Sequence, residues 1–117
     1  MTKRYLQLQL ASHKYEVFAV IFLDNRHRVL AFEILCEGTI NAATVPPRHV
    51  LQRCLEIDSA AVTLAHNHPS GEVLPSEADR TLTRTLKQLL SQVDVQVLDH
   101  VIVGSGEAYS FAENGNL

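Results

Sequence analysis

The chain opens with a hydrophobic pattern that predicts a β-hairpin. Residues 17–23 form an unbroken apolar run rich in β-branched and aromatic side chains, which predicts a buried strand. Residues 24–27 are polar and predict the link of a hairpin. Residues 28–36 would then form the returning strand, which ends before Gly38.

The remaining pattern alternates between helical and extended spacing. It predicts a helix, a strand, a second helix and two further strands at residues 47–57, 60–65, 76–92, 94–103 and 108–112. Residues 1–15, where Leu6, Leu8 and Leu10 alternate with glutamines, predict either a short edge strand or an N-terminal segment leading into a domain at residues 16–117. The pattern as a whole predicts an α/β or α+β fold, with a mixed sheet and two helices in two or three layers.

Composition narrows the class of protein. A chain of 117 residues with 46% hydrophobic and 20% charged residues is typical of one soluble domain. No apolar run approaches the roughly 18 residues of a membrane helix, and no secretory leader follows the basic start. The net charge of −3 does not favour strong DNA binding. Cys36 and Cys54 are expected to be reduced thiols in a cytoplasmic protein.

The candidate chemistry begins where the strand at residues 60–65 ends. His66 and His68 lie two positions apart, so in an extended chain both imidazoles can face one point. Seven residues separate His68 from Ser76, and Asp79 follows at the start of a helical pattern. Two nitrogens and one carboxylate oxygen suit zinc and leave a fourth position for water, as in catalytic zinc sites.

Each part of this pattern also has an ordinary interpretation. Two histidines could belong to a polar turn, and Ser76 with Asp79 matches a helix capping box. The cap and the metal site are compatible, because a cap that fixes the helix start also aims the aspartate. The joint spacing is rare by chance and therefore favours a metal site. The sequence has no HExxH and no PCxxC, so other zinc-hydrolase patterns do not apply.

The combined string HxHP, seven residues, then SxxD resembles the signature of the JAMM (MPN+/JAB) metalloproteases. Further strings resemble the RadC branch of that group: Asn41-Ala42-Ala43, His66-Asn67-His68-Pro69-Ser70-Gly71, Pro75-Ser76-x-x-Asp79 and Leu98-Asp99-His100. The resemblance extends from about Tyr15 to Leu117. It implies the JAMM/MPN fold, a curved mixed sheet flanked by helices with a cytidine-deaminase-like architecture. Longer RadC proteins have a helical region ahead of this domain, so the chain resembles the short, single-domain form.

The resemblance also implies roles for individual residues. It implies one zinc ion held by His66, His68 and Asp79, with Ser76 stabilising the oxyanion of a tetrahedral intermediate. The family's general base is a glutamate just before the first core strand, a place that Glu16 occupies here. Glu33 is a rival, because alternation places it on a mostly apolar strand face.

His100 has two interpretations. It follows Asp99 in an apolar strand, so it is either a core histidine or a hydrogen-bonding partner behind the metal ligands.

The resulting functional hypothesis is a zinc-dependent hydrolase, a JAMM-type metallopeptidase or isopeptidase that acts on a peptide or protein substrate. The first alternative is a DNA-repair or recombination accessory protein of the RadC type. The second is a metal-bearing binding module that has lost hydrolysis. Neither strong DNA binding by this domain nor a membrane partner is expected.

Overall fold

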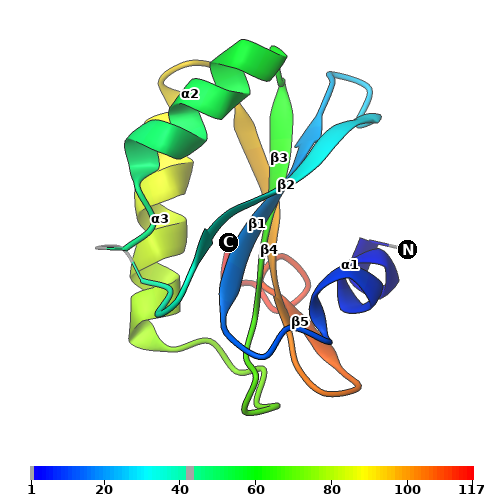
Figure 1. Ribbon diagram of the computed structural model, residues 1–117. Helices are drawn as coiled ribbons and strands as arrows, with labels where there is room; N and C mark the ends of the chain where they lie inside the picture. The colour runs from blue at the N-terminus through cyan, green and yellow to red at the C-terminus, as the bar shows by residue number, and fades with distance from the viewer. Residues whose placement is uncertain (1, 42–43) are drawn as a thin grey trace.

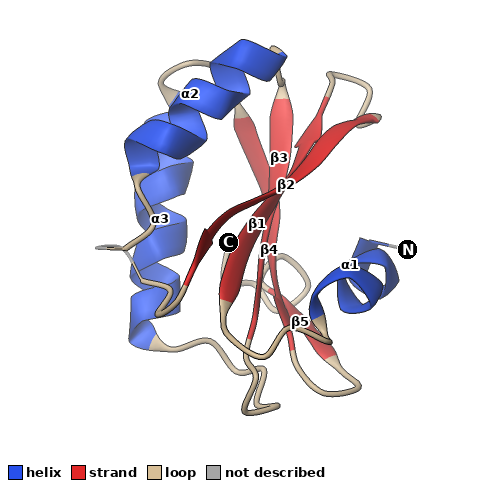
Figure 2. Ribbon diagram, viewed as in Figure 1, coloured by secondary structure: helices blue, strands red, loops and turns tan. Residues whose placement is uncertain are grey.

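A five-stranded mixed sheet lies between helices on its two faces (Figures 1 and 2). The computed structural model describes residues 2–41 and 44–117, so Ala42 and Ala43 of the Asn41-Ala42-Ala43 string lie outside the described residues. In chain order the elements are α1 (Thr2–Leu10), β1 (Val17–Leu23), β2 (Val29–Glu37), α2 (Pro47–Ile57), β3 (Ala61–Asn67), α3 (Glu77–Ser91), β4 (Gln96–Val103) and β5 (Ala108–Ser110). The predicted α/β class, with a mixed sheet flanked by helices, is confirmed.

The unbroken apolar run of β1 results from burial on both faces of the sheet. Phe18, Val20 and Phe22 pack in the core beneath α2 and α3. Ala19 and Ile21, on the opposite face, belong to the core beneath α1. A strand covered on both sides has no solvent face, so it lacks the polar alternation of a half-exposed strand.

The strand order is β2-β1-β3-β4-β5, which places β1 and β3 beside each other near the centre. β1 runs antiparallel to both β2 and β3, whereas β3 and β4 are parallel. Parallel neighbours need a long crossover, and α3 supplies it. The helix that follows the histidine-bearing strand therefore returns along that strand and starts beside its end.

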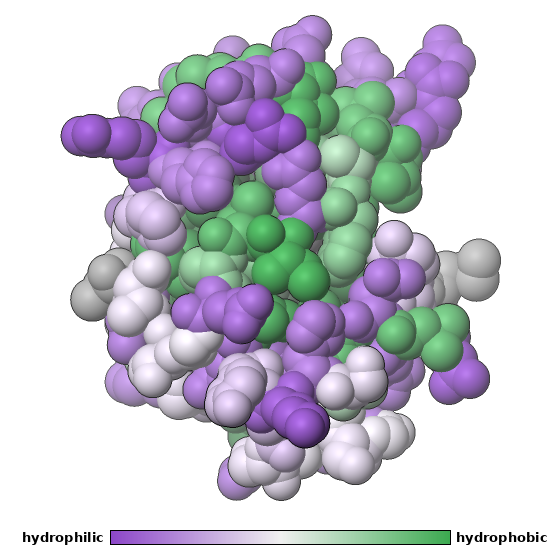
Figure 3. Space-filling view, in the orientation of Figure 1, coloured by the Kyte–Doolittle hydropathy of each residue, from purple (hydrophilic) through white to green (hydrophobic). Residues whose placement is uncertain are grey.

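β2 lies at one edge of the sheet and is more exposed than β1. Val29 and Ile34 expose 64% and 41% of their surface. Hydrophobic side chains are visible over this part of the face in Figure 3, surrounded by hydrophilic ones. Two bulges interrupt the pairing of β1 with β2 and bend this edge of the sheet.

The N-terminal segment corrects one of the two sequence interpretations. Thr2–Leu10 is a helix, so the edge-strand alternative for residues 1–15 is wrong. Among the described residues three helices flank the sheet, where the sequence predicted two. Leu6 and Leu10 are fully buried against the sheet, whereas Leu8 is 68% exposed. The two buried leucines are therefore four residues apart, as expected for one face of a helix, and Leu8 lies outside that face.

The other predicted elements are present with small shifts at their ends. The helix at residues 47–57 has the predicted bounds, and Pro47 occupies its first turn. The predicted strand at 94–103 starts at Gln96, because Asp94 adopts a left-handed turn with φ of 59°. The final strand ends at Ser110, before a turn. None of the described helices is long and apolar enough to cross a membrane.

Candidate metal centre

Two histidine side chains converge at the end of β3. His66 is the penultimate residue of the strand and is fully buried, and His68 follows just beyond it. Their Nε2 atoms lie 3.0 Å apart. The spacing of two residues thus places both imidazoles on the same side of the chain, as predicted from the geometry of a strand.

Asp79 reaches the same point from the start of α3. Its Oδ1 lies 3.2 Å from Nε2 of His66, and its Oδ2 lies 3.4 Å from Nε2 of His68. Burial alone would raise the pKa of Asp79, but the adjacent His66 and His68 side chains hold that pKa well below its ordinary value. The same carboxylate raises the pKa of His68.

The capping box is present in the same residues. The Asp79 N–H donates to Oγ of Ser76 over 3.1 Å, and the Ser76 N–H donates to Oδ2 of Asp79 over 2.8 Å. One carboxylate therefore caps the helix and faces the histidines. The capping interpretation of the SxxD string is thus confirmed, and it is compatible with a metal-binding role for the same carboxylate.

The spacing of these atoms fits zinc. A tetrahedral ion with ligand bonds of about 2.0–2.1 Å separates neighbouring ligand atoms by about 3.3 Å. The two Nε2 atoms are 3.0 Å apart, and each lies 3.2 or 3.4 Å from a different oxygen of Asp79, so all three separations are close to that value. His66, His68 and Asp79 are also a donor set found in zinc hydrolases, two imidazoles and one carboxylate.

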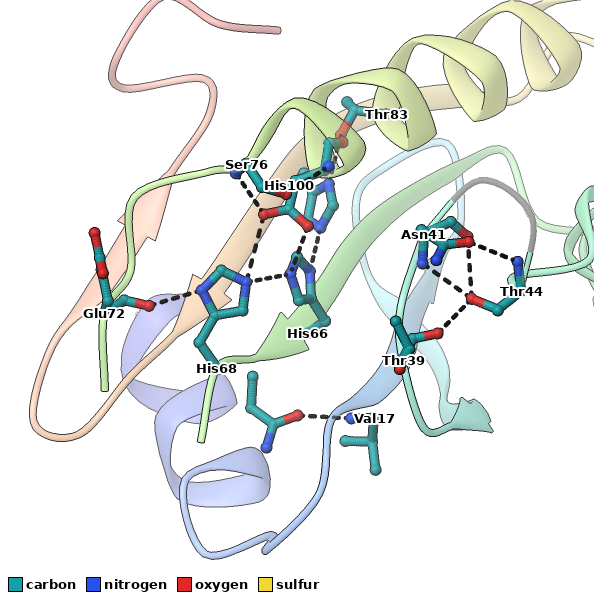
Figure 4. A network of polar contacts seen from close by, with 12 residues as sticks. Val17, Thr39, Asn41, Thr44, His66, His68, Glu72, Ser76, Thr83 and His100 are labelled. Carbon is teal, nitrogen blue, oxygen red and sulfur yellow. Dashed lines mark hydrogen bonds and ion pairs between the residues drawn. The ribbon is translucent and has the colours of Figure 1, made fainter. Parts of the chain in front are cut away.

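The loop after β3 fixes the orientation of His68. The His68 backbone N–H donates to the Val103 carbonyl over 2.8 Å, and its ring Nδ1 lies 2.7 Å from the Glu72 carbonyl. A carbonyl only accepts, so Nδ1 carries a proton and donates it (Figure 4). Gly104 allows the loop to pack this closely, since an added Cβ would lie 2.4 Å from the Gly71 carbonyl oxygen.

Glu16, which directly precedes β1, also lies close to the two histidines. It forms a group with His66 and His68 in which the ligand atoms lie within 4.8 Å of one another. Glu16 is half-buried, whereas Asp79 is 2% exposed and tied to its helix start. Asp79 is therefore the better-fixed ligand, and Glu16 is the carboxylate on the solvent side.

The side chain of Asn67, which the sequence analysis did not single out, holds the backbone beside Glu16. Its Oδ1 accepts from the Val17 N–H over 2.7 Å, and its Nδ2 donates to the Tyr15 carbonyl over 3.0 Å. The Glu16 carbonyl itself accepts from the Gly38 N–H. Asn67 lies between the two histidines, and alternation turns its side chain to the opposite side. Its position between the two histidines was the only feature of the sequence that could have indicated this role.

Glu33 does not join this cluster. It pairs with Val20 in the middle of the hairpin, and Arg53 of α2 donates to it through Nε over 2.9 Å and also through Nη2. These hydrogen bonds lower the pKa of Glu33, which makes its carboxylate a weaker base. Of the two candidate bases, only Glu16 lies beside the histidines.

His100 stands directly behind His66. Its Nε2 lies 2.8 Å from Nδ1 of His66, and its Nδ1 lies 2.6 Å from Oγ1 of Thr83 (Figure 4). His100 is fully buried, and burial lowers its pKa well below the ordinary value, so the ring is neutral. Asp99 does not contact this ring; it accepts from Ser110 and from the backbone of Ala112. The sequence analysis missed Thr83, which only the packing of α3 on β4 reveals.

The cluster opens into a cavity of about 700 Å³. Glu16, His68, Ser76 and Asp79 all line it. Lys14 and several uncharged residues complete the wall, among them Tyr15, Thr39, Ile40, Asn41 and Ser70. His68 and Asp79 therefore face the cavity, whereas His66 is fully buried behind them.

Comparison with known proteins agrees with the motif. The family description "RadC-like JAB domain" matches residues 1–116. A UPF0758 protein of Nitrosococcus oceani is 59% identical over 116 residues, which are 99% of this chain and 52% of that protein. A UPF0758 protein of Vibrio cholerae is 54% identical over 114 residues, 97% of this chain and 72% of that protein. The chain thus spans about half the length of the first relative. On these matches and on its fold, the chain belongs to the RadC-like JAB domain family.

Proposed function

We propose that this domain is a zinc-dependent hydrolase of the JAMM type that cleaves peptide or isopeptide bonds. The observation that carries the proposal is the placement of two carboxylates, Asp79 and Glu16, beside one histidine pair. Both carboxylates line the cavity, but Asp79 is buried and tied to its helix start, as suits a metal ligand, whereas Glu16 is only half-buried, as suits a base. A purely structural site would not need the second carboxylate or the cavity.

The residues divide the work of hydrolysis in a simple way. Zinc held by His66, His68 and Asp79 would lower the pKa of a water molecule at its open position towards about 7. Glu16 takes the proton from the attacking water and later passes it to the departing amine. The same carboxylate thus acts as base and then as acid.

Ser76 supports this assignment from the other wall of the cavity. Its oxygen accepts the capping hydrogen bond from Asp79, and this leaves the hydroxyl hydrogen free for another partner. We propose that this hydrogen stabilises the oxyanion that develops on the substrate carbonyl. Ser76 thereby combines a structural and a catalytic role.

The working environment follows from the thiols. Cys36 and Cys54 are both free, one half-buried and one buried. Free thiols are stable in a reducing compartment, so we propose that the protein acts in the cytoplasm.

The test combines metal analysis with a substrate screen. Purified protein should contain one zinc per chain, and a His66→Ala/His68→Ala double variant should contain none. On a library of peptides and isopeptide-linked conjugates, the wild-type protein should cleave and Glu16→Gln should not, although it retains zinc. Metal content unchanged in the double variant would refute the metal site. Zinc binding without cleavage of any substrate would favour the binding-module alternative.

A further inference from the structure

Three buried polar side chains, Thr83, His100 and His66, form a row that leads from α3 to the proposed metal site. Thr83 donates its hydroxyl hydrogen to the Asp79 carbonyl over 2.9 Å, because a carbonyl oxygen only accepts. A threonine hydroxyl has one hydrogen. Its oxygen must therefore accept from Nδ1 of His100, 2.6 Å away.

The direction of the hydrogen bond between His100 and His66 follows from that of the first two. A neutral imidazole has one donor and one acceptor nitrogen, so His100 with a proton on Nδ1 accepts at Nε2. His66 must then donate from its Nδ1, which lies 2.8 Å from that acceptor. A proton on Nδ1 leaves Nε2 of His66, the atom that faces Asp79 and His68, as the nitrogen that can bind a metal ion.

We infer that Thr83 and His100 are positioning residues that fix His66 in the tautomer able to bind a metal ion through Nε2. The inference deepens the proposed function, on which its consequence for zinc affinity rests. The tautomer itself is a property of the metal-free protein.

Packing holds the row in place. His100 stacks on Phe111, with ring centroids 4.7 Å apart and planes 12° apart, and it meets the edge of Phe18. Thr83 is 3% exposed and sits one helical turn after Asp79. The row therefore connects one proposed ligand, His66 on β3, to the backbone of another, Asp79 on α3. The His100 ring cannot turn over without breaking both of its buried hydrogen bonds.

Thr83→Val is the sharpest test, because it removes the hydroxyl and keeps a β-branched side chain. The proton on Nδ1 of His100 then loses its acceptor. The ring is expected to move that proton to Nε2 and to donate it to His66, which pushes the proton of His66 onto its own Nε2. Long-range ¹H–¹⁵N NMR of the metal-free protein reports this directly, with the His66 signals identified by their loss in His66→Gln. We expect the Nδ1–H form in wild type and the Nε2–H form in Thr83→Val.

Zinc affinity provides the second measurement, by competition with a chromophoric chelator. Loss of a hydrogen-bonding partner behind a metal ligand typically weakens binding about ten- to a hundredfold, and we expect that loss for Thr83→Val. Thr83→Ser keeps the hydroxyl and should retain near wild-type affinity. Thr81→Val is the matched control, since Thr81 is exposed on the same helix and its hydroxyl accepts from Arg84.

The outcomes separate the two proposals. A wild-type His66 protonated on Nε2 would overturn the inference, and so would a Thr83→Val protein with unchanged tautomer and unchanged zinc affinity. A wild-type protein with the expected tautomer that binds no zinc would refute the proposed function alone. Circular dichroism of each variant establishes that the fold is retained.

Discussion

Asn67 and Glu16 are linked through the backbone on both sides of the glutamate. The Asn67 amide accepts from the Val17 N–H and donates to the Tyr15 carbonyl, so the residue between the two histidines also sets the position of the carboxylate opposite them. Asn67 thus connects the proposed metal ligands on β3 to the proposed base at the start of β1. Hydrolysis is sensitive to such positioning, because a misplaced base loses hydrogen-bond reach of the water.

Asn67→Ala should therefore impair catalysis and stability while zinc remains bound. The change leaves the N–H of Val17 buried without its acceptor, which typically destabilises a protein by about 1–3 kcal/mol. Urea unfolding should show a loss in that range, and metal analysis should show one zinc per chain. Asn25→Ala, in the exposed hairpin turn, is the control. Unchanged turnover in a stable Asn67→Ala protein would contradict this role.

Glu33 offers a matched comparison for Glu16. Glu33→Gln breaks a partly exposed ion pair with Arg53, whose contribution to the free energy of unfolding is about 0–1 kcal/mol. We expect zinc content and turnover to stay at the wild-type level. Glu16→Gln should retain zinc and lose turnover. The reverse result, with Glu33→Gln inactive and Glu16→Gln active, would indicate that Glu33 on β2 is the general base.

The features that sequence predicts well are those set by local spacing. β1 was predictable because a run of seven apolar residues leaves few alternatives to a buried strand. The convergence of His66 and His68 follows from strand geometry alone. Ser76 and Asp79 follow from capping chemistry, which determines where α3 starts.

The features that sequence did not predict depend on distant packing. Leu8 made the first segment look extended, and only the contact of Leu6 and Leu10 with the sheet shows that four-residue spacing decides. The choice between Glu16 and Glu33 required Arg53, on α2, to be placed beside Glu33. Thr83 reaches His100 only because α3 packs on β4, and no local pattern marks that contact.

Thiol reactivity tests the packing of α2. Burial raises the pKa of Cys54 to about 11. At pH 8 about one thiol in a thousand would then be ionised, and only the thiolate reacts. In a Cys36→Ser background, Cys54 should react with a disulfide reagent at least about a hundredfold more slowly in native protein than in urea, because unfolding restores an ordinary pKa. Equal rates in both states would contradict the burial of this thiol.

Duplex DNA should bind weakly to this domain. Arg53, one of the few cations near the sheet edge, is paired with Glu33 and Glu56. Arg80, Arg84 and Lys87 line a groove beside the C-terminal residues, but three cations on a chain of net charge −3 provide little phosphate neutralisation. We expect dissociation constants weaker than about 1 µM at physiological salt, and little change in Arg80→Glu/Arg84→Glu. Micromolar or tighter binding with a steep salt slope would favour the DNA-repair alternative.

The two roles of Asp79 can be separated by two substitutions. In Asp79→Asn the amide oxygen can still accept from the Ser76 N–H, so the helix cap survives. The substitution removes the negative charge that a divalent cation requires and should eliminate bound zinc. The substitution removes a burial penalty together with the favourable contacts to His66 and His68, so the metal-free variant should melt near the temperature of the metal-free wild type.

Ser76→Ala should show the opposite balance. It removes the acceptor of the Asp79 N–H and should weaken the helix start by about 0.5–2 kcal/mol, while the carboxylate keeps its place beside His66 and His68. Zinc should remain, and turnover should fall through loss of the hydroxyl donor. Zinc content and thermal melts of both variants, with and without chelator, make the comparison. If Asp79→Asn held zinc as tightly as wild type, the ion would rest on the histidines and Glu16 instead, and Glu16 could not then serve as the free base.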